Sequence, residues 1–448
     1  MQYSGCLHCS EANLKRRDFI RVGSLSFLGI GLQQWIQLNQ LMAGGNGGVS
    51  PKAKAESCIL LWLEGGPSHI DTWDPKASSA FKPISTNVPG IQISELLPRI
   101  AKKMDKLSLI RSVHTEEVDH APATHYAATA HRAVSAMTFP SLGSIIAKEM
   151  GTRRDVPAYV LEPKWDMEAN VYQGYFGAAF LGTEYDPMVL PDPSKKDFVV
   201  PDLSLPKTLS VERVRERLAF QKEIDHVYRQ KLELAEYANL DSVTERALQT
   251  ILSPAVKQAF DLSKESDKTK ETYGLHGFGQ SVLLARRMVE AGCRFVTAAG
   301  FEFNEWDTHG NSDKRHKNQL TPKLDQTLST LLEDLDQRGL LDSTIVLVMG
   351  EFGRTPDLNP SGGRDHYPTC WSLAIGGGGI RGGQVVGASD ERGALVASRM
   401  VTMGDIFATV YKAFGIDWTK EYMTPVGRPV KIANSIGDVT GTPIQELG

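Results

Sequence analysis

"TPKLDQTLSTLLEDLDQRGLLDSTIVLVMG", residues 321–350, sets a predicted helix directly before a predicted strand. Thr321 and Pro322 suit the N-cap and first turn of a helix. Leucines that recur every three or four residues line one face of this helix, namely Leu320, Leu324, Leu328, Leu331 and Leu335. The strand at 343–350 is β-branched and apolar, which predicts that both of its faces are buried.

A second helix and strand precede this pair. "GQSVLLARRMVEAG", residues 279–292, has the pattern of an amphipathic helix that ends at Gly292, and "CRFVTAAG", residues 293–300, reads as a strand. Strands that alternate with helices and are apolar on both faces are typical of a parallel sheet covered by helices. The sequence therefore predicts an α/β fold with a mostly parallel sheet flanked by helices.

Three shorter apolar runs complete the predicted sheet. They cover residues 57–66, 107–113 and 157–163, and each is too short to compete as a helix. Residues 202–272 differ in composition, because they are charged and favour helix. We interpret them as a helical insertion in a domain that spans 56–448, either with a partner surface or as solvated helices on its flank.

The overall composition narrows the functional classes. The chain has 448 residues, 41% of them hydrophobic and 23% charged, which is typical of a globular protein. Its formal net charge of -4 gives no basic surface of the kind that nucleic acid requires, so we expect no nucleic-acid partner. Of five cysteines, two precede residue 10, and the remaining three make no disulfide framework.

The N-terminus resembles a targeting signal. In "KRRDFIRVGSLSFLGIGL", residues 15–32, two arginines precede a glycine-interrupted apolar run, as in a twin-arginine export signal. That run is shorter than the about 20 apolar residues that cross a bilayer, so we expect no stable transmembrane span in the mature form. We assign residues 1–55 to the signal and a linker. The signal would either be cleaved at residues 53–55 or remain uncleaved as an anchor. The expected partner is the twin-arginine export machinery, and the expected location is periplasmic or extracytoplasmic.

Carboxylates and imidazoles follow several predicted strands. Parallel strands end at one edge of a sheet, where sites of α/β proteins collect. The candidate metal ligands at that edge are Glu64, Asp307, His309, Glu351, Asp365 and His366. Carboxylate oxygen with imidazole nitrogen is the ligand set of zinc, manganese or iron, and one or two ions fit this number of groups. The alternative is that the Asp and His pairs only cap loops or support other ligands.

Other polar residues near the strand ends have less certain roles. Arg354 either holds a phosphate or sulfate oxygen or forms a salt bridge with Glu351 or Asp357. In the histidine-rich segment 112–132, His114 and His120 remain candidates.

Nucleophile candidates also lie near strand ends. They are Ser68, Ser112 and Thr115, and none of them sits in a GxSxG motif. "GGGGIRGG", residues 376–383, lacks the GK[ST] of a phosphate-binding loop.

Several stretches together resemble one protein family. "RRDFIRVG" (16–23), "LEGGPSHIDTWDPK" (63–76), "WDTHGN" (306–311) and "GRDHYP" (363–368) look like the exported bacterial proteins of the domain-of-unknown-function 1501 family, and the match runs in order along the chain. That family is similar to the alkaline phosphatase and sulfatase superfamily. The resemblance implies an alkaline phosphatase-like α/β/α sandwich with one or two metal ions at the carboxyl edge.

The resemblance also implies roles for individual residues. Glu64 falls where the superfamily has its first-strand metal carboxylate, although that residue is expected to be Asp. Phe352 follows Glu351 where a histidine is expected. No residue stands clearly at the nucleophile position, where the segment 117–125 offers His120. The catalytic candidates are His120, Arg354, Ser68 and His69.

These features predict an exported, metal-dependent hydrolase of phosphate or sulfate esters. Its substrate would be a small-molecule or glycan ester, and its cofactor a divalent metal: zinc, manganese or calcium. The alternative is a catalytically inactive binding or scaffold protein on the same fold, which the altered ligands and the missing nucleophile favour.

Overall fold

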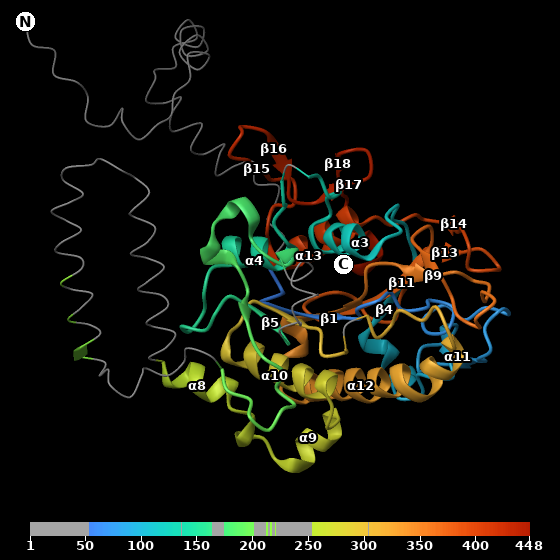
Figure 1. Ribbon diagram of the computed structural model, residues 1–448, viewed down its shortest axis with the longest axis horizontal. Coiled ribbons are helices and arrows are strands. Elements are labelled where there is room, and N and C mark those ends of the chain that lie inside the picture. Colours follow the sequence, from blue (N-terminus) through green and yellow to red (C-terminus); the bar gives the residue numbers. More distant parts are fainter. Residues whose placement is uncertain are drawn as a thin grey trace, which may run out of the picture. The chain divides into compact units, whose positions relative to one another are not determined.

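The computed structural model in Figure 1 describes residues 53–135, 137–163, 174–200, 253–302 and 304–448, with four isolated positions between 212 and 220. The predicted export signal lies outside the described residues. So does most of the predicted helical insertion, of which four positions between 212 and 220 and the part from residue 253 are described. Among the described helices, none has both the length and the hydrophobicity that crossing a membrane requires.

The described residues contain an eight-stranded sheet. Its order is β12 (Val385–Val386), β4 (Ser108–Val113), β11 (Trp371–Gly376), β8 (Thr344–Met349), β1 (Ser57–Trp62), β7 (Phe295–Ala298), β5 (Tyr159–Glu162) and β6 (Met188–Val189). All neighbouring pairs are parallel except the two that β11 makes with β4 and β8. The predicted mostly parallel sheet is therefore confirmed.

Strand β1 runs through the middle of the sheet. Leu61 lies beside Ala298 of β7 on one side and Val348 of β8 on the other. Because side chains alternate along a strand, Leu61 enters one apolar core and Leu60 enters a second core on the opposite face. All six residues of β1 are buried, as its uninterrupted apolar sequence predicts.

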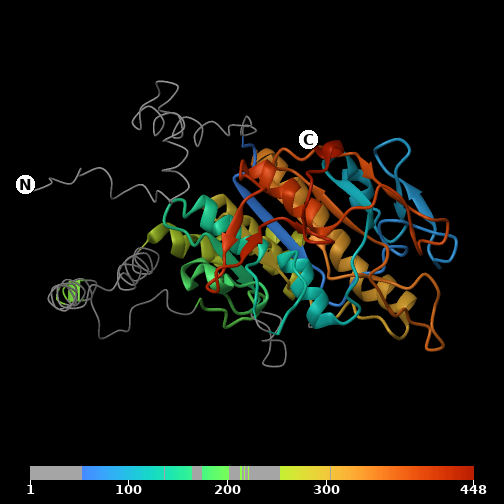
Figure 2. The ribbon, with the colours of Figure 1, turned by 90° about the horizontal axis from the view of Figure 1, so that it is seen from above.

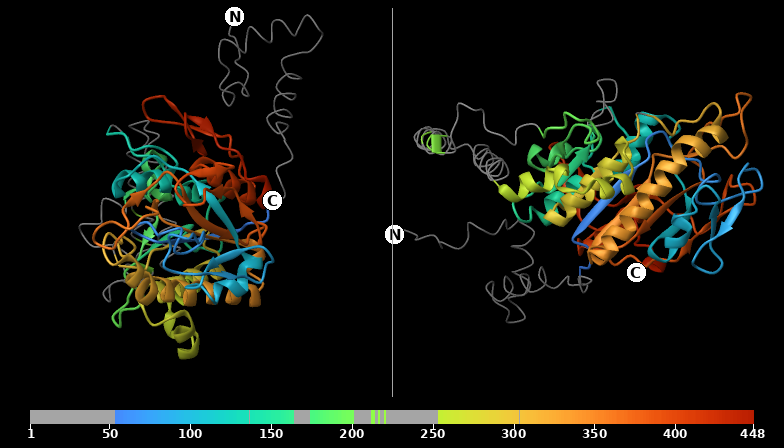
Figure 3. Two further views of the ribbon diagram at one scale, coloured as in Figure 1. Left: turned by 90° about the vertical axis from the view of Figure 1, so that its right-hand side faces the viewer. Right: turned by 90° about the horizontal axis from the view of Figure 1, so that it is seen from below.

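Helices cover both faces of the sheet. One face carries α10 (Gly277–Ala291) and α12 (Thr321–Gln337), which Figure 3 shows from below. The other face carries α3 (His120–Thr129), α4 (Leu142–Met150) and α13 (Met403–Phe414), seen from above in Figure 2. The five leucines predicted to line one face of a helix are all fully buried. The described residues thus form a three-layer α/β/α sandwich.

Short elements complete the described chain. The remaining helical segments are η2 (Ile100–Lys106), η4 (Ala179–Leu181), η5 (Thr183–Tyr185), α8 (Pro254–Phe260), η6 (Leu262–Lys264), α9 (Asp267–Tyr273), α11 (Ser312–Arg315), the π-helical turn η7 (His316–Leu320), η8 (Leu341–Ser343) and η9 (Gln445–Leu447). The two-stranded sheets are β2 (Pro83–Ser85) with β3 (Gln92–Ser94), β9 (Gly353–Arg354) with β10 (His366–Tyr367), β13 (Ala388–Ser389) with β14 (Val396–Ser398), β15 (Glu421–Met423) with β16 (Pro429–Lys431), and β17 (Asn434–Ser435) with β18 (Val439–Thr440).

The strand directions bring distant segments to one edge. Strands β1, β4, β7 and β8 all end at this edge, and the antiparallel strand β11 begins there. The loops after β1, β7 and β8 therefore meet the segment that leads into β11. This edge holds every predicted metal ligand.

Candidate metal centre

The backbone of the loop after β1 is in direct contact with the backbone of the loop after β7. Gly65 has a φ of 109°, and a Cβ atom placed on it would lie 2.4 Å from the backbone nitrogen of Asp307. A side chain at position 65 would push Asp307 away, so glycine is required here. The backbone N–H of Trp306 also donates to the carbonyl of Glu64 at 3.0 Å. These contacts fix where Asp307 stands.

Asp307 is the hub of the site. Its Oδ1 lies 3.2 Å from Nε2 of His309 and 3.3 Å from Nε2 of His366, and its Oδ2 lies 3.5 Å from Nε2 of His120. Burial raises the pKa of the Asp307 carboxyl, but the neighbouring histidines and Arg354 outweigh this and hold the pKa far below its usual range. Asp307 is therefore a carboxylate at neutral pH.

The spacing around Asp307 suits a metal ion. The Nε2 atoms of His309 and His366 are 3.0 Å apart, so with Asp307 Oδ1 they form a triangle whose edges measure 3.0, 3.2 and 3.3 Å. An ion with tetrahedral bonds of about 2.0 Å holds its ligand atoms about 3.3 Å apart. The three atoms thus already have the separation of ligands to one small cation.

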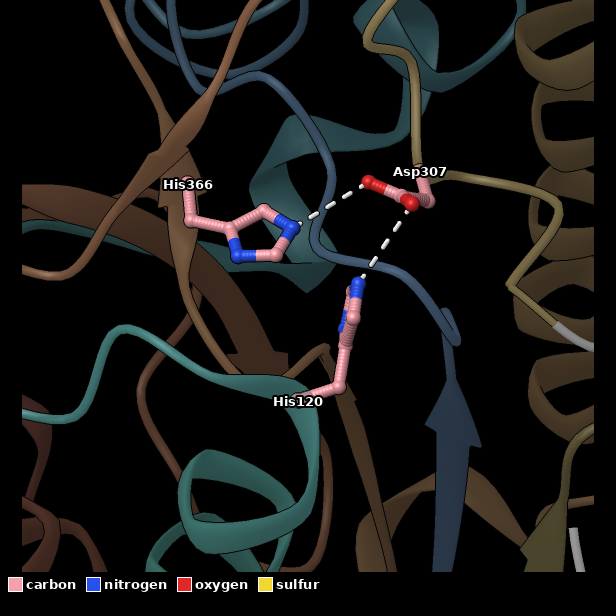
Figure 4. A group of neighbouring side chains, drawn as sticks. All are labelled: His120, Asp307 and His366. Atoms are coloured by element: carbon pink, nitrogen blue, oxygen red, sulfur yellow. Dashed lines mark hydrogen bonds and ion pairs between the residues drawn. The ribbon is translucent and has the colours of Figure 1, made fainter.

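His120 completes the cluster from α3. Figure 4 shows its imidazole pointing at Asp307, and ligand atoms of His120, Asp307 and His366 all lie within 4.8 Å of one another. The Nε2 of His120 is buried and makes no hydrogen bond of ordinary geometry. Burial lowers the pKa of His120, but the carboxylates of Asp307 and Glu351 outweigh it and raise the pKa to about 9. Two carboxylates thus favour positive charge at this point.

Each histidine of the cluster is held by its other ring nitrogen. Nδ1 of His120 lies 2.7 Å from Glu351 Oε1, Nδ1 of His309 lies 2.7 Å from Asp365 Oδ1, and Nδ1 of His366 lies 2.6 Å from the carbonyl of Val118. Since these oxygens accept the Nδ1 hydrogen, each Nε2 can present its lone pair to an ion. Metal-binding histidines are typically oriented in this way by a carboxylate or carbonyl.

A family model described as "Protein of unknown function (DUF1501)" matches residues 55–445. The chain belongs to the DUF1501 family. This confirms the family that the sequence motifs resemble. The comparison with curated proteins finds no match.

Several solved structures are similar to this DUF1501 chain. The lipoteichoic acid synthase LtaP from Listeria monocytogenes has 10% identity and a TM-score of 0.43, over 87% of this chain and 78% of that one. The PsFucS1 sulfatase from Pseudoalteromonas sp. has 14% identity and a TM-score of 0.39, over 90% and 75%. The alkaline phosphatase from the Antarctic bacterium TAB5 has 12% identity and a TM-score of 0.38, over 81% and 98%. Likenesses this weak carry no conclusion about activity.

Two buried glutamates lie behind the histidines of the DUF1501 site. Glu351 accepts from the backbone N–H of Gly65 at 3.0 Å as well as from His120, so it supports that imidazole. Glu64 is also fully buried; its Oε2 accepts from the indole of Trp62 and its Oε1 has no partner. Burial and the charge of Glu351 raise the pKa of Glu64 to about 8. The surroundings of Glu64 therefore disfavour a negative charge on its carboxyl.

Arg354 lies beneath the cluster and does not face solvent. Its guanidinium is fully buried and donates to the carbonyls of Gly65, Gly66 and Arg364 and, at 2.5 Å, to Asp307 Oδ1. Of the two roles that the sequence leaves open for Arg354, the observed one is a salt bridge, although its partner is Asp307. Arg354 therefore orients a candidate ligand.

The other predicted residues lie apart from the cluster. Ser68 is fully buried and donates to Asp71 Oδ2 at 2.6 Å, and Nε2 of His69 contacts the carbonyl of Gly393 at 2.8 Å. Nδ1 of His114 contacts the carbonyl of Thr369 at 2.8 Å. The hydroxyls of Ser112 and Thr115 donate to the backbone carbonyls of Arg399 and Pro368.

Sequence reasoning missed two supporting groups of the DUF1501 site. The carbonyl of Val118 fixes His366, and Nδ2 of Asn359 donates to Asp365 Oδ1 at 2.9 Å. A backbone carbonyl leaves no trace in the residue types. Asn359 does lie in the same glycine-rich loop as Asp365, and its place there is the one signal that could have found it.

Proposed function

We propose that this protein is a metal-dependent hydrolase of phosphate or sulfate esters. The observation that carries the proposal is that three imidazoles, each fixed through Nδ1, direct Nε2 toward Asp307. Imidazole nitrogens around one carboxylate, at the carboxyl edge of an α/β sheet, are a typical arrangement for hydrolytic metal sites. The resemblance of the sequence to the alkaline phosphatase and sulfatase superfamily supports the same reaction class.

The donor set favours zinc or manganese over calcium. Calcium takes six to eight oxygen ligands, whereas His120, His309 and His366 offer nitrogen. The ion would be held by Asp307 with two or three of these histidines, and one ion accounts for the triangle of ligand atoms. Two histidines with one carboxylate also bind iron, so a metal analysis must include it.

The chemistry follows from this ligand set. Such an ion, when bound, polarises an ester oxygen and lowers the pKa of water. Glu351 and Asp365 keep the histidines in the tautomer that binds metal, and Arg354 keeps Asp307 ionised. None of the described serine, threonine or cysteine side chains is hydrogen-bonded to the side chains of His120, Asp307, His309 or His366, so we propose direct attack by water without a covalent intermediate.

One side of the site is open to a substrate. The side chains of His309 and Asp365 are 46% and 52% exposed, whereas those of Glu351 and Arg354 are fully buried. An ester would therefore approach past His309. We propose a small-molecule or glycan ester as the substrate.

A binding or scaffold role is the second candidate. It is favoured by the burial of Arg354, which leaves this arginine unable to hold an oxyanion, and by the lack of a nucleophilic side chain among the described residues of the cluster. A protein of this kind would bind metal or ligand without turnover.

Metal content tests the hydrolase proposal. We expect purified protein to hold close to one equivalent of zinc, manganese or iron by elemental mass spectrometry, and to hydrolyse members of a panel of phosphate and sulfate esters. The double variant Asp365→Asn with His366→Ala should lose both the bound metal and the hydrolytic activity. Bound metal with no turnover across the panel would favour the scaffold role, and metal-free protein after reloading would refute the metal site.

We further propose export by the twin-arginine route to an extracytoplasmic location. The support is Arg16 and Arg17 before the apolar run. In cell fractionation, the full-length protein should appear outside the cytoplasm, and a variant with both arginines replaced by lysine should stay inside. If the unchanged protein and the variant were found in the same fractions, the twin-arginine route would be contradicted.

A further inference from the structure

A second cavity lies away from the metal centre, at the other end of α3. It has a volume of about 310 Å³ and lies between the end of α3, the loop that follows it and the hairpins near the C-terminus. It shares no residue with the metal cluster. Tyr126, one of its lining residues, lies six positions after His120, or about 9 Å along the helix axis.

One wall of the cavity is aromatic. The imidazole of His131 stacks on Phe139 with ring centroids 4.2 Å apart and an angle of 7° between the planes. Tyr126 adds a third ring, and its hydroxyl has no hydrogen-bond partner among the described residues. Flat rings of this kind pack against the apolar face of a cyclic ligand.

Two unpaired acceptors accompany the rings. Nε2 of His131 lies 2.9 Å from the carbonyl of Lys431 and therefore donates to it, which leaves Nδ1 as an acceptor with no partner among the described residues. Burial lowers the pKa of His131 to about 4, so the ring is neutral near pH 7. Asn434 is only 9% exposed, and its Oδ1 has no hydrogen-bond partner within the described part of the chain. This oxygen is enclosed by the protein, so Nδ1 of His131 is the acceptor that we expect a ligand in the cavity to use.

Arg428 stands out among the charged residues that line the cavity. The other charged lining residues have partners. Arg132 pairs with Glu116, and the carboxylate of Asp438 lies 3.8 Å from the ammonium group of Lys431. The exposed guanidinium of Arg428 has no ion-pair partner among the described residues. An anionic group on a ligand would find a bidentate partner there.

We propose that this cavity binds a sugar unit that carries a carboxylate or a sulfate group. Such a unit offers an apolar ring face for the His131 and Phe139 stack, a hydroxyl donor for Nδ1 of His131, and an anion for Arg428. The volume suits one such ring rather than a folded partner. The proposal does not depend on the metal centre or on hydrolysis.

Titration calorimetry with short oligosaccharides tests the site in the full-length protein. The probes are a trigalacturonate, a sulfated galactose trimer and the neutral galactose trimer. We expect at least one anionic trimer to bind, and the neutral trimer to bind at least tenfold more weakly. The two anionic probes distinguish a carboxylate ligand from a sulfate ligand.

Two variants locate the binding. Arg428→Ala should weaken the anionic trimer at least tenfold and should fold normally, because Arg428 is exposed. Tyr126→Phe, which removes only the unpaired hydroxyl, should weaken all bound trimers by a smaller factor. Arg381→Ala is the matched control, because Arg381 is also exposed and lies outside the cavity.

The outcomes separate this site from the metal centre. Binding that survives Asp307→Asn but falls with Arg428→Ala supports the proposal, whether or not the protein proves to be a hydrolase. Failure of both anionic trimers to bind would overturn it. Equal affinity in Arg428→Ala and the unchanged protein would also overturn it.

Discussion

Asp307→Asn should lower the affinity for the bound divalent metal by at least about 100-fold. Asp307 lies within 3.5 Å of Nε2 of three histidines, and asparagine offers no negative charge to the ion. Changing a residue that only supports a metal ligand typically costs about 10- to 100-fold, so losing a ligand should cost at least the upper value. The measurement is competition with a chromogenic chelator, and ester hydrolysis should fall in parallel.

A graded comparison makes this test specific. Glu351→Gln keeps the shape of a group that supports His120 but removes its charge, and we expect a loss of about 10- to 100-fold. Asp357→Asn, on an exposed carboxylate paired with Arg392, should leave metal affinity unchanged. Equal affinity in Asp307→Asn and Asp357→Asn would refute the site on Asp307.

Asp71→Asn should lower the free energy of unfolding by about 3–5 kcal/mol. Asp71 and Arg364 form an ion pair at 2.8 Å in which both side chains are fully buried. Removing one charge leaves the other without compensation in the interior, and Asp71 also accepts hydrogen bonds from Ser68 and Ser79. Urea unfolding followed by circular dichroism measures the change.

The variant Asp357→Asn is also the control for the free energy of unfolding. The pair of Asp357 with Arg392 is exposed on both sides, so Asp357→Asn should change stability by less than about 1 kcal/mol. If Asp71→Asn also lowered the free energy of unfolding by less than about 1 kcal/mol, the buried pair would not stabilise the fold as predicted.

The pH dependence of the Asp71 contribution follows from the direction of its pKa shift. Burial alone would raise the pKa of Asp71, but His316 and Arg364 outweigh it and hold the pKa below its usual range. A carboxyl with a lowered pKa in the folded state stabilises the protein at neutral pH. That contribution is lost as the pH falls from the ordinary carboxyl range through the lowered pKa.

The sequence predicted the layers well because the signals for them are local. Strand β8 and helix α12 follow from apolar runs and leucine spacing within residues 320–349, and both are confirmed. The direction of β11 was not predictable in the same way. Its apolar residues suit either direction, and only its pairing with β4 and β8 makes it antiparallel.

For the site, the sequence named the residue types and the edge but not the contacts. Glu64 and Glu351 look alike as carboxylates after strands, yet Glu351 supports His120 while Glu64 has one oxygen without a partner. The sequence left open whether Arg354 holds an anion or forms a salt bridge, and the structure buries it against Asp307. Such differences depend on which side chain meets which across the sheet edge.

The sequence by itself determined the α/β class, the helix and strand positions and the family, because apolar periodicity and short motifs act over a few neighbouring residues. The tertiary structure alone decided that His120 from α3 and His366 from β10 meet Asp307, and that carboxylates and a carbonyl hold the Nδ1 atoms. These residues lie up to 246 positions apart, from 120 to 366. Their meeting depends on the order and direction of the strands, which local residue patterns do not encode.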